Sequence, residues 1–133
     1  MQTVFYYQGS PVHRLVKDGW LQCGDIVNGS GANSVACLDR TGSVPDESFS
    51  VDFGCPLGGI VGFANAGPHT NGSQFFITLG SCAWMNSKYV GFGRVVQGYN
   101  VLRFLNTLPT NNQRPVHNVL IGSCGVAPEP NSN

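Results

Sequence analysis

The stretch FANAGPHTNGSQFFITL, residues 63–79, decides how the rest of the chain is interpreted. Two turn signals, Gly67-Pro68 and Asn71-Gly72, precede an apolar run that predicts a strand over residues 74–79. A second block, YQGSPVHRLVKDGWLQCGD at residues 7–25, alternates turns with short apolar runs in the same way. We therefore expect a β-rich domain that contains both blocks.

The rest of the chain has the same texture. Eighteen glycines and eight prolines break it into short runs rich in Val, Ile, Phe and Tyr, which is typical of strands joined by turns. One helix is expected over residues 100–105, capped by Asn100 and stopped by Pro109, and residues 28–53 predict a long irregular loop. The remaining expected strands cover residues 3–7, 11–16, 20–22, 60–63, 90–96 and 116–121.

Composition limits the class of protein. The 133 residues fit one domain, expected over residues 1–126 with a polar tail at 127–133. Seven basic side chains balance seven acidic ones, so nothing indicates a nucleic acid or a membrane surface as partner. No run approaches the roughly 18 apolar residues of a membrane span, and no signal-peptide pattern opens the chain. Five cysteines without a CxxC pair favour a reducing compartment. We expect a cytoplasmic protein, with a cytoskeletal or ciliary assembly as the alternative location.

Together the two blocks closely resemble the signature stretches of the cyclophilins, which are peptidyl-prolyl cis-trans isomerases. The pattern ANAGPxTNGSQFF is long and rich in uncommon residues, and WMNSKYVGFGRVVQG and VLIGSCGV follow in the family's order. DGWLQ and LPTNNQRPVH resemble the divergent isomerase-like 6 branch of that family. The resemblance implies an eight-stranded barrel with two capping helices. Because this chain begins where the third strand would, we expect a mostly β, cyclophilin-like barrel without the first two strands and first helix, with one short helix near the C-terminal end.

The resemblance also implies a site. Rotation about an X-Pro bond must break amide resonance, with a barrier of ~18–20 kcal/mol, and the guanidinium of Arg14 would donate to the deconjugated nitrogen. No cofactor is implied, and His13, His69 and His117 lack metal-ligand spacing. The residues implied to bind the peptide are Trp20, Gln22, Ala64, Asn65, Ala66, Gln74, Phe76, Trp84, Met85 and Tyr89.

The resemblance implies a role for six of these positions. Gln22 and Gln74 would orient the arginine and bind the substrate backbone, and the main chain of Asn65 would bind the peptide. Phe76 would form the floor of the proline pocket and Met85 an apolar wall. Trp84 stands at the position associated with cyclosporin, which makes that drug a candidate ligand.

Four positions depart from the family pattern. Gly19 stands where most active members carry a pocket phenylalanine, Trp20 replaces a methionine, Tyr89 replaces a histidine, and Cys23 replaces a glycine. Losing a buried phenylalanine wall removes ~1.5–3 kcal/mol, which weakens proline binding about ten- to a hundredfold unless Trp20 fills the space. We therefore expect isomerase activity that is weak or lost.

Plainer interpretations stay open. Taken alone, Arg14 is more often structural, Phe76 and Trp84 would be core residues, and Gln74 would pair with backbone. Two functions remain: a domain that binds proline-containing peptides or proteins, and a non-catalytic structural or interaction module within a larger assembly. The second follows from the edges that an incomplete barrel leaves open, which a partner would cover.

Overall fold

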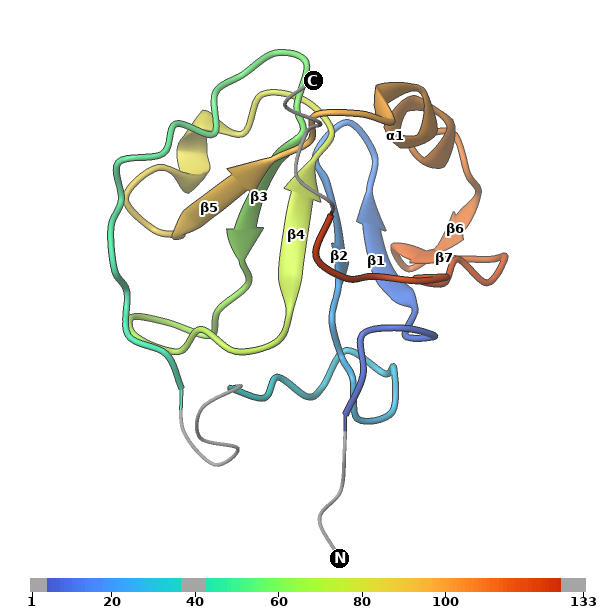
Figure 1. The fold of residues 1–133 in the computed structure, drawn as a ribbon. Helices are drawn as coiled ribbons and strands as arrows, with labels where there is room; N and C mark the ends of the chain where they lie inside the picture. The colour runs from blue at the N-terminus through green and yellow to red at the C-terminus, as the bar shows by residue number, and fades with distance from the viewer. Residues whose placement is uncertain (1–4, 37–42, 128–133) are drawn as a thin grey trace, which may run out of the picture.

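The computed structural model describes residues 5–36 and 43–127 and confirms a mostly β fold with one short α-helix near the C-terminal end (Figure 1). The strands of the main sheet lie in the order β1-β2-β4-β3-β5, and β6 and β7 form a separate hairpin. The elements are β1 (Val12–Val16), β2 (Trp20–Cys23), β3 (Ile60–Phe63), β4 (Phe75–Thr78), the 3-10 helix η1 (Ala83–Met85), β5 (Gly91–Arg94), α1 (Tyr99–Leu105), β6 (Thr110–Asn111) and β7 (Arg114–Pro115).

The register of the main sheet positions the candidate site. All its neighbouring strands run antiparallel, and Arg14 on β1 pairs with Gln22 on β2, which pairs with Phe76 on β4. Directly paired residues of antiparallel strands point to the same face of a sheet. The guanidinium, the amide and the aromatic ring therefore rise from one row across three strands.

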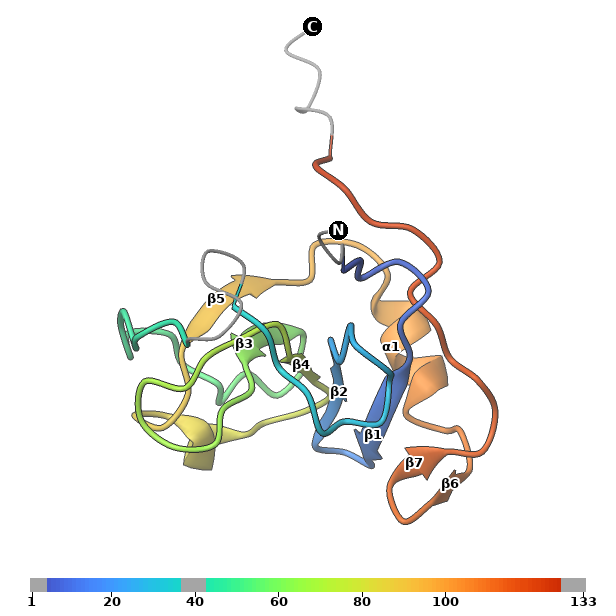
Figure 2. The same ribbon diagram turned by 90° about the horizontal axis from the view of Figure 1, so that it is seen from below.

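The opposite face carries part of the core, because successive side chains along a strand alternate between faces. Leu15 and Leu21 pack there in a cluster that Leu102 of α1 completes, and the helix lies beside β1 and β2 (Figure 2). A second cluster, beneath the site, is formed by Phe53, Phe76, Cys82 and Met85. The helix thus supports the back of the strands that carry the site.

Most expected elements are confirmed, with shifted ends. The strand over residues 60–63 is as predicted, and the described parts of residues 28–53 contain no strand beyond an isolated bridge at Val44. The helix begins at Tyr99, so the expected Asn100 cap is wrong. Gly98 occupies the cap position with a left-handed φ of 95°, a conformation that glycine adopts without steric cost.

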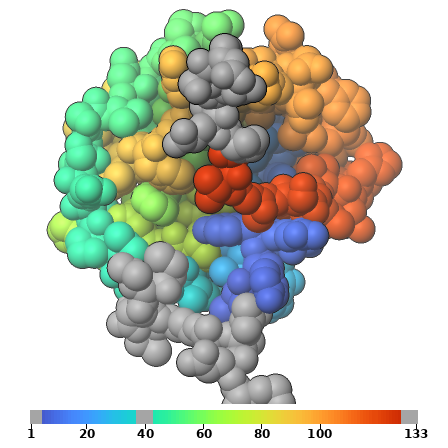
Figure 3. All heavy atoms as spheres, in the orientation of Figure 1, coloured from blue at the N-terminus to red at the C-terminus, as the bar shows by residue number. Residues whose placement is uncertain are grey.

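Both ends of the chain differ from expectation. Residues 116–121 form no strand; Leu120 makes one isolated bridge to Pro11, and the ladder breaks at Ser10, whose amide donates to the Tyr7 carbonyl at 2.9 Å instead of to this segment. The segment still lies along β1, since the Val12 amide donates to the Val119 carbonyl at 2.8 Å, and its red spheres lie beside the blue N-terminal ones in Figure 3. Residues 5–7 are not a strand, whereas residues 3–4 and the tail from 128 onward lie outside the described residues.

The main sheet does not close into a barrel among the described residues. β5 stands at one edge of the strand order, and Phe92 on it is 53% exposed although its ring packs 4.4 Å from that of Phe63. Val96 just beyond the strand is 79% exposed. This edge presents apolar surface and strand backbone to solvent.

Within the described ranges, no helix has the length and apolar character needed to cross a bilayer.

Candidate functional site

Arg14 lies on the exposed side of β1 and is held from two directions. Its guanidinium carbon lies 5.1 Å from the centroid of the Trp20 ring, a cation–π arrangement, and its Nε donates to Oε1 of Gln113 at 2.9 Å. Neither contact uses the terminal nitrogens, which make no hydrogen bond within the described part of the chain. The terminal N–H groups of the Arg14 guanidinium are therefore held in a fixed orientation and remain free to donate hydrogen bonds to a ligand.

A relay of side-chain amides forms the polar wall beside the arginine. The indole Nε1 of Trp20 donates to Oε1 of Gln22 at 3.2 Å, and Nε2 of Gln22 donates to Oε1 of Gln74 at 2.9 Å. Gln74 in turn donates to the carbonyls of Gly31 at 2.9 Å and Asn33 at 2.7 Å. The direct hydrogen bonds of Gln22 thus go to Trp20 and Gln74, and its effect on the arginine passes through the indole.

A hollow of about 100 Å³, here called the proline hollow, opens beside these groups and has both polar and apolar side chains in its lining. Phe76, only 1% exposed, packs edge-on against Tyr89 at 5.4 Å between ring centroids. Met85, also 1% exposed, is positioned by η1. The residues that line the proline hollow are Arg14, Trp20, Gln22, Ala64, Asn65, Phe76, Met85 and Tyr89.

The other predicted binding residues lie next to the proline hollow. Ala66 and Gln74 line a neighbouring hollow of about 240 Å³, here called the amide hollow, which shares Gln22, Ala64 and Asn65 with the proline hollow. Trp84 lies at the rim: it is 52% exposed, with its ring edge-on to that of Trp20 at 5.6 Å. The structure thus gathers every residue of the predicted set into one neighbourhood.

Two of the departures from the family pattern now have structural descriptions. Gly19 does not line the proline hollow; its carbonyl accepts hydrogen bonds from the Leu79 amide at 2.7 Å and from Cys82 Sγ at 3.3 Å, while Trp20 supplies the wall. Cys23 is buried in the core cluster that Leu102 completes, and burial raises the pKa of its thiol to about 12. Its φ is not positive, so no glycine is required at this position.

Gln113, the partner of Arg14, was not predicted from the sequence. It lies with Asn112 in the turn between β6 and β7. Asn112 has a φ of 51° and Gln113 a φ of 66°, and a two-residue type I′ hairpin turn requires positive φ at both positions. Its carbonyl also accepts from the Leu15 amide. A turn could have been anticipated from the Asn-Asn pair, but no local signal relates it to a strand 99 residues away.

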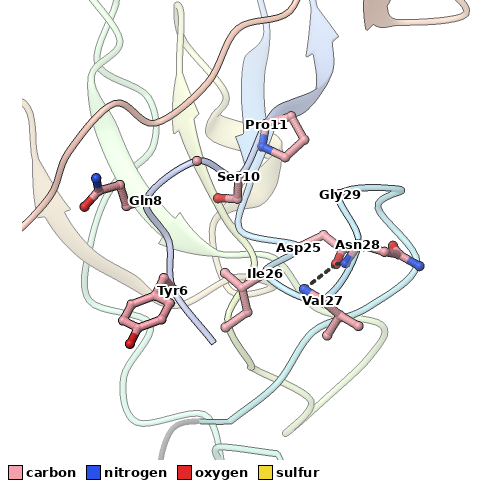
Figure 4. A pocket seen from close by; sticks show the side chains of 10 residues that line it. Tyr6, Gln8, Ser10, Pro11, Asp25, Ile26, Val27, Asn28 and Gly29 are labelled. Atoms are coloured by element: carbon pink, nitrogen blue, oxygen red, sulfur yellow. Dashed lines mark hydrogen bonds between the residues drawn. The ribbon is translucent and has the colours of Figure 1, made fainter. Parts of the chain in front are cut away.

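Asp25 anchors the loop behind the amide relay, beside a further hollow of about 240 Å³ (Figure 4). Burial alone would raise the pKa of this carboxyl, but hydrogen bonds from Asn28, Val27 and Asn33 outweigh it and hold the pKa well below its usual range. The amide of Gly31 also donates to it at 2.8 Å. Asp25 thereby fixes the two carbonyls that hold Gln74, and its lone pairs are already used by the loop.

Among the described residues, no three His, Cys, Asp or Glu side chains are arranged to hold an ion. His13 is buried with its Nδ1 unpaired, and burial lowers the pKa of its imidazole. The candidate site consists of a guanidinium, an amide relay and the proline hollow.

Comparison with known proteins gives these features a context. The family described as cyclophilin type peptidyl-prolyl cis-trans isomerase/CLD matches residues 1–126. The chain is 43% identical over 120 residues to the "Probable inactive peptidyl-prolyl cis-trans isomerase-like 6" of Bos taurus and 42% identical to that of Homo sapiens. It is 40% identical over 121 residues to the "Peptidyl-prolyl cis-trans isomerase cyp11" of Rhizopus delemar. These matches cover 90% of this chain in each case.

The length of the relatives differs from that of this chain. The matched region is 38% of the bovine relative and 37% of the human one. A crystal structure of a cyclophilin type isomerase from Cryptosporidium parvum superposes with a TM-score of 0.85 at 30% sequence identity, covering 94% of this chain and 77% of the other. Fold and sequence therefore agree on one family.

Proposed function

The chain belongs to the cyclophilin-type peptidyl-prolyl isomerase family, and from that premise we propose that it binds extended proline-containing peptides, with isomerase activity that is weak or lost. The observation that carries the proposal is the guanidinium of Arg14, held with free donors beside a small hollow that Phe76 and Met85 help to line. The proposed domain comprises residues 1–126, followed by the tail at 127–133.

The proposed binding follows from the lining of the two hollows. A proline ring is apolar and lacks an N–H, so it suits the small hollow between Phe76, Met85 and Trp20. The peptide backbone on one side of the ring requires hydrogen-bonding partners, which Oε1 of Gln74 and the main chain at Asn65 would supply in the amide hollow, since both protons of Gln74 Nε2 are already donated to the loop. The proposed binding residues are those predicted from the sequence.

The proposed chemistry needs no nucleophile. When the X-Pro bond twists, its nitrogen loses conjugation and accepts a hydrogen bond, and a fixed donor at that point favours the twisted state. The terminal nitrogens of Arg14 would supply this donor.

Two observations support a reduced rate. The wall that a phenylalanine would form at position 19 is replaced by Trp20, which also holds the guanidinium. The bovine, human and mouse relatives carry names that call them probably inactive.

The test separates binding from catalysis. Titration of the chain with an Ala-Pro peptide, followed by NMR, is expected to shift the amides of Asn65, Gln74 and Phe76, whereas the same peptide with alanine in place of proline is not. Exchange spectroscopy then compares cis/trans rates in wild type and Arg14→Ala. Equal shifts with both peptides would refute binding, and equal exchange rates in the two proteins would leave a binding domain without catalysis.

A second function, a non-catalytic module within a larger assembly, rests on the open β5 edge with its exposed Phe92. An unpaired strand edge with apolar side chains is a template for another segment of polypeptide. If the isolated chain is a monomer by light scattering and melts cooperatively, this alternative loses its main support.

The proposed location is cytoplasmic. The four described cysteines, Cys23, Cys55, Cys82 and Cys124, are all free, which suits a reducing compartment.

A further inference from the structure

A larger hollow, with a volume of about 530 Å³, adjoins the proline hollow and shares Asn65 and Tyr89 with it. We call it the outer hollow. It is built by three segments that are distant in sequence: the end of the long loop, the turn after β3, and the loop between η1 and β5. Its lining residues are Asp46, Phe49, Asn65, Gly67, Pro68, His69, Ser87, Lys88 and Tyr89.

The outer hollow is continuous with the proposed peptide groove. Asn65 and Tyr89 line both it and the proline hollow, whereas the proline hollow shares Gln22, Ala64 and Asn65 with the amide hollow. Asn65 lines all three hollows, so they meet at this residue. A peptide with its proline in the proline hollow and its backbone in the amide hollow has a neighbouring residue within reach of the outer one, since each extended residue advances about 3.3 Å.

The lining of the outer hollow favours an apolar or aromatic side chain. Phe49, 44% exposed, contributes a ring, and Pro68 and Tyr89 add further apolar surface. The exposed ammonium of Lys88 has no ion-pair partner among residues 5–36 and 43–127. The opposite charge in the hollow, Asp46, is already engaged: its two oxygens accept from Asn71 Nδ2 at 2.8 Å and from the His69 amide at 3.0 Å.

The rim of the hollow is held in place before any ligand binds. The Asp46 amide donates to Nδ1 of His69 at 3.0 Å, so these two residues are joined in both directions. On the wall shared with the proline hollow, Nδ2 of Asn65 donates to the Lys88 carbonyl at 3.1 Å. A preformed hollow costs a ligand less ordering entropy than one that must be assembled.

We propose that the outer hollow is a specificity subsite that accepts a large apolar or aromatic side chain of the same peptide, within about three residues of its proline, preferably next to an acidic residue. The inference rests on the proposed peptide binding and deepens it by naming a sequence preference. Phe49 and Lys88 determine the preference, because neither lines the proline hollow.

The test uses the full chain and a series of alanine-based peptides, each with one proline and with phenylalanine scanned over the three positions on each side. One position is expected to tighten Kd about three- to tenfold over the parent peptide, as partial burial of one ring provides. Phe49→Ala should remove that gain and Phe49→Leu should retain most of it, while both bind the parent peptide as wild type does. Leu57→Ala is the matched control, since Leu57 is exposed and lines none of the three hollows.

Charge is tested separately. Adding glutamate beside the preferred phenylalanine should tighten Kd about two- to fivefold, and Lys88→Gln should abolish this increment only. If the parent peptide fails to bind, the proposed function itself is wrong. If it binds but no phenylalanine position gives a gain in wild type, or if the gain survives Phe49→Ala, the subsite is refuted while peptide binding stands.

Discussion

Replacing Gln113 with glycine is expected to release Arg14 without disturbing the fold. Gln113 has a φ of 66°, a conformation that glycine adopts more easily than glutamine, so the β6–β7 turn should be at least as stable in the variant. Its carbonyl can still accept from the Leu15 amide. What disappears is the hydrogen bond of 2.9 Å between Oε1 of Gln113 and Nε of Arg14.

The magnitude follows from that one contact. A single hydrogen bond contributes about 0.5–1.5 kcal/mol net, and the other restraint on the guanidinium, the face of Trp20, remains in place. If Arg14 must be oriented to contact the peptide, Gln113→Gly should weaken proline-peptide binding about two- to tenfold and slow any catalysed exchange by a similar factor. Peptide titration and exchange spectroscopy measure both quantities.

The matched control is Asn112→Gly in the same turn, where φ is also positive at 51° and Arg14 keeps its partner. This variant should bind the peptide as wild type does. If Gln113→Gly also behaves as wild type while Arg14→Ala loses binding, Gln113 does not position the arginine. If Asn112→Gly is weakened as much as Gln113→Gly, the conformation of the turn matters and the side chain does not.

Two further predictions concern the support of the site. A β-carbon on Gly62 would lie 2.7 Å from Cζ of Phe76, so Gly62→Ala should lower the free energy of unfolding by about 1–3 kcal/mol and weaken proline binding. Denaturant melts and peptide titration measure the two effects. A variant that melts as wild type does would contradict the packing described. The pKa of Asp25 is depressed in the folded chain, so its contribution to stability is present above its unfolded pKa of about 3.9 and is lost as the pH falls from about 5. Urea melts should show this loss in wild type and a flatter profile in Asp25→Asn, and parallel profiles would exclude it.

Local sequence signals predicted the strands well because they depend on near neighbours. A short apolar run after Gly58-Gly59 placed the strand over residues 60–63 correctly, and the motif at residues 63–79 predicted the family. The same reasoning was wrong about Asn100. The helix begins one residue earlier, at Tyr99, and Gly98 occupies the cap position in a left-handed conformation. The reasoning also failed at residues 116–121, where the Ser10 amide of the neighbouring segment donates to the Tyr7 carbonyl and the ladder ends.

The sequence by itself determined which residues are present for the site: Arg14, the glutamines at 22 and 74, and Phe76 all stand in recognisable motifs. Only the tertiary structure decided how they are held, because those contacts join residues far apart in the chain. The bond from Arg14 to Gln113 spans 99 positions, and the outer hollow joins three separate segments. Contacts of this kind depend on how strands and loops pack in three dimensions, which short-range patterning does not encode.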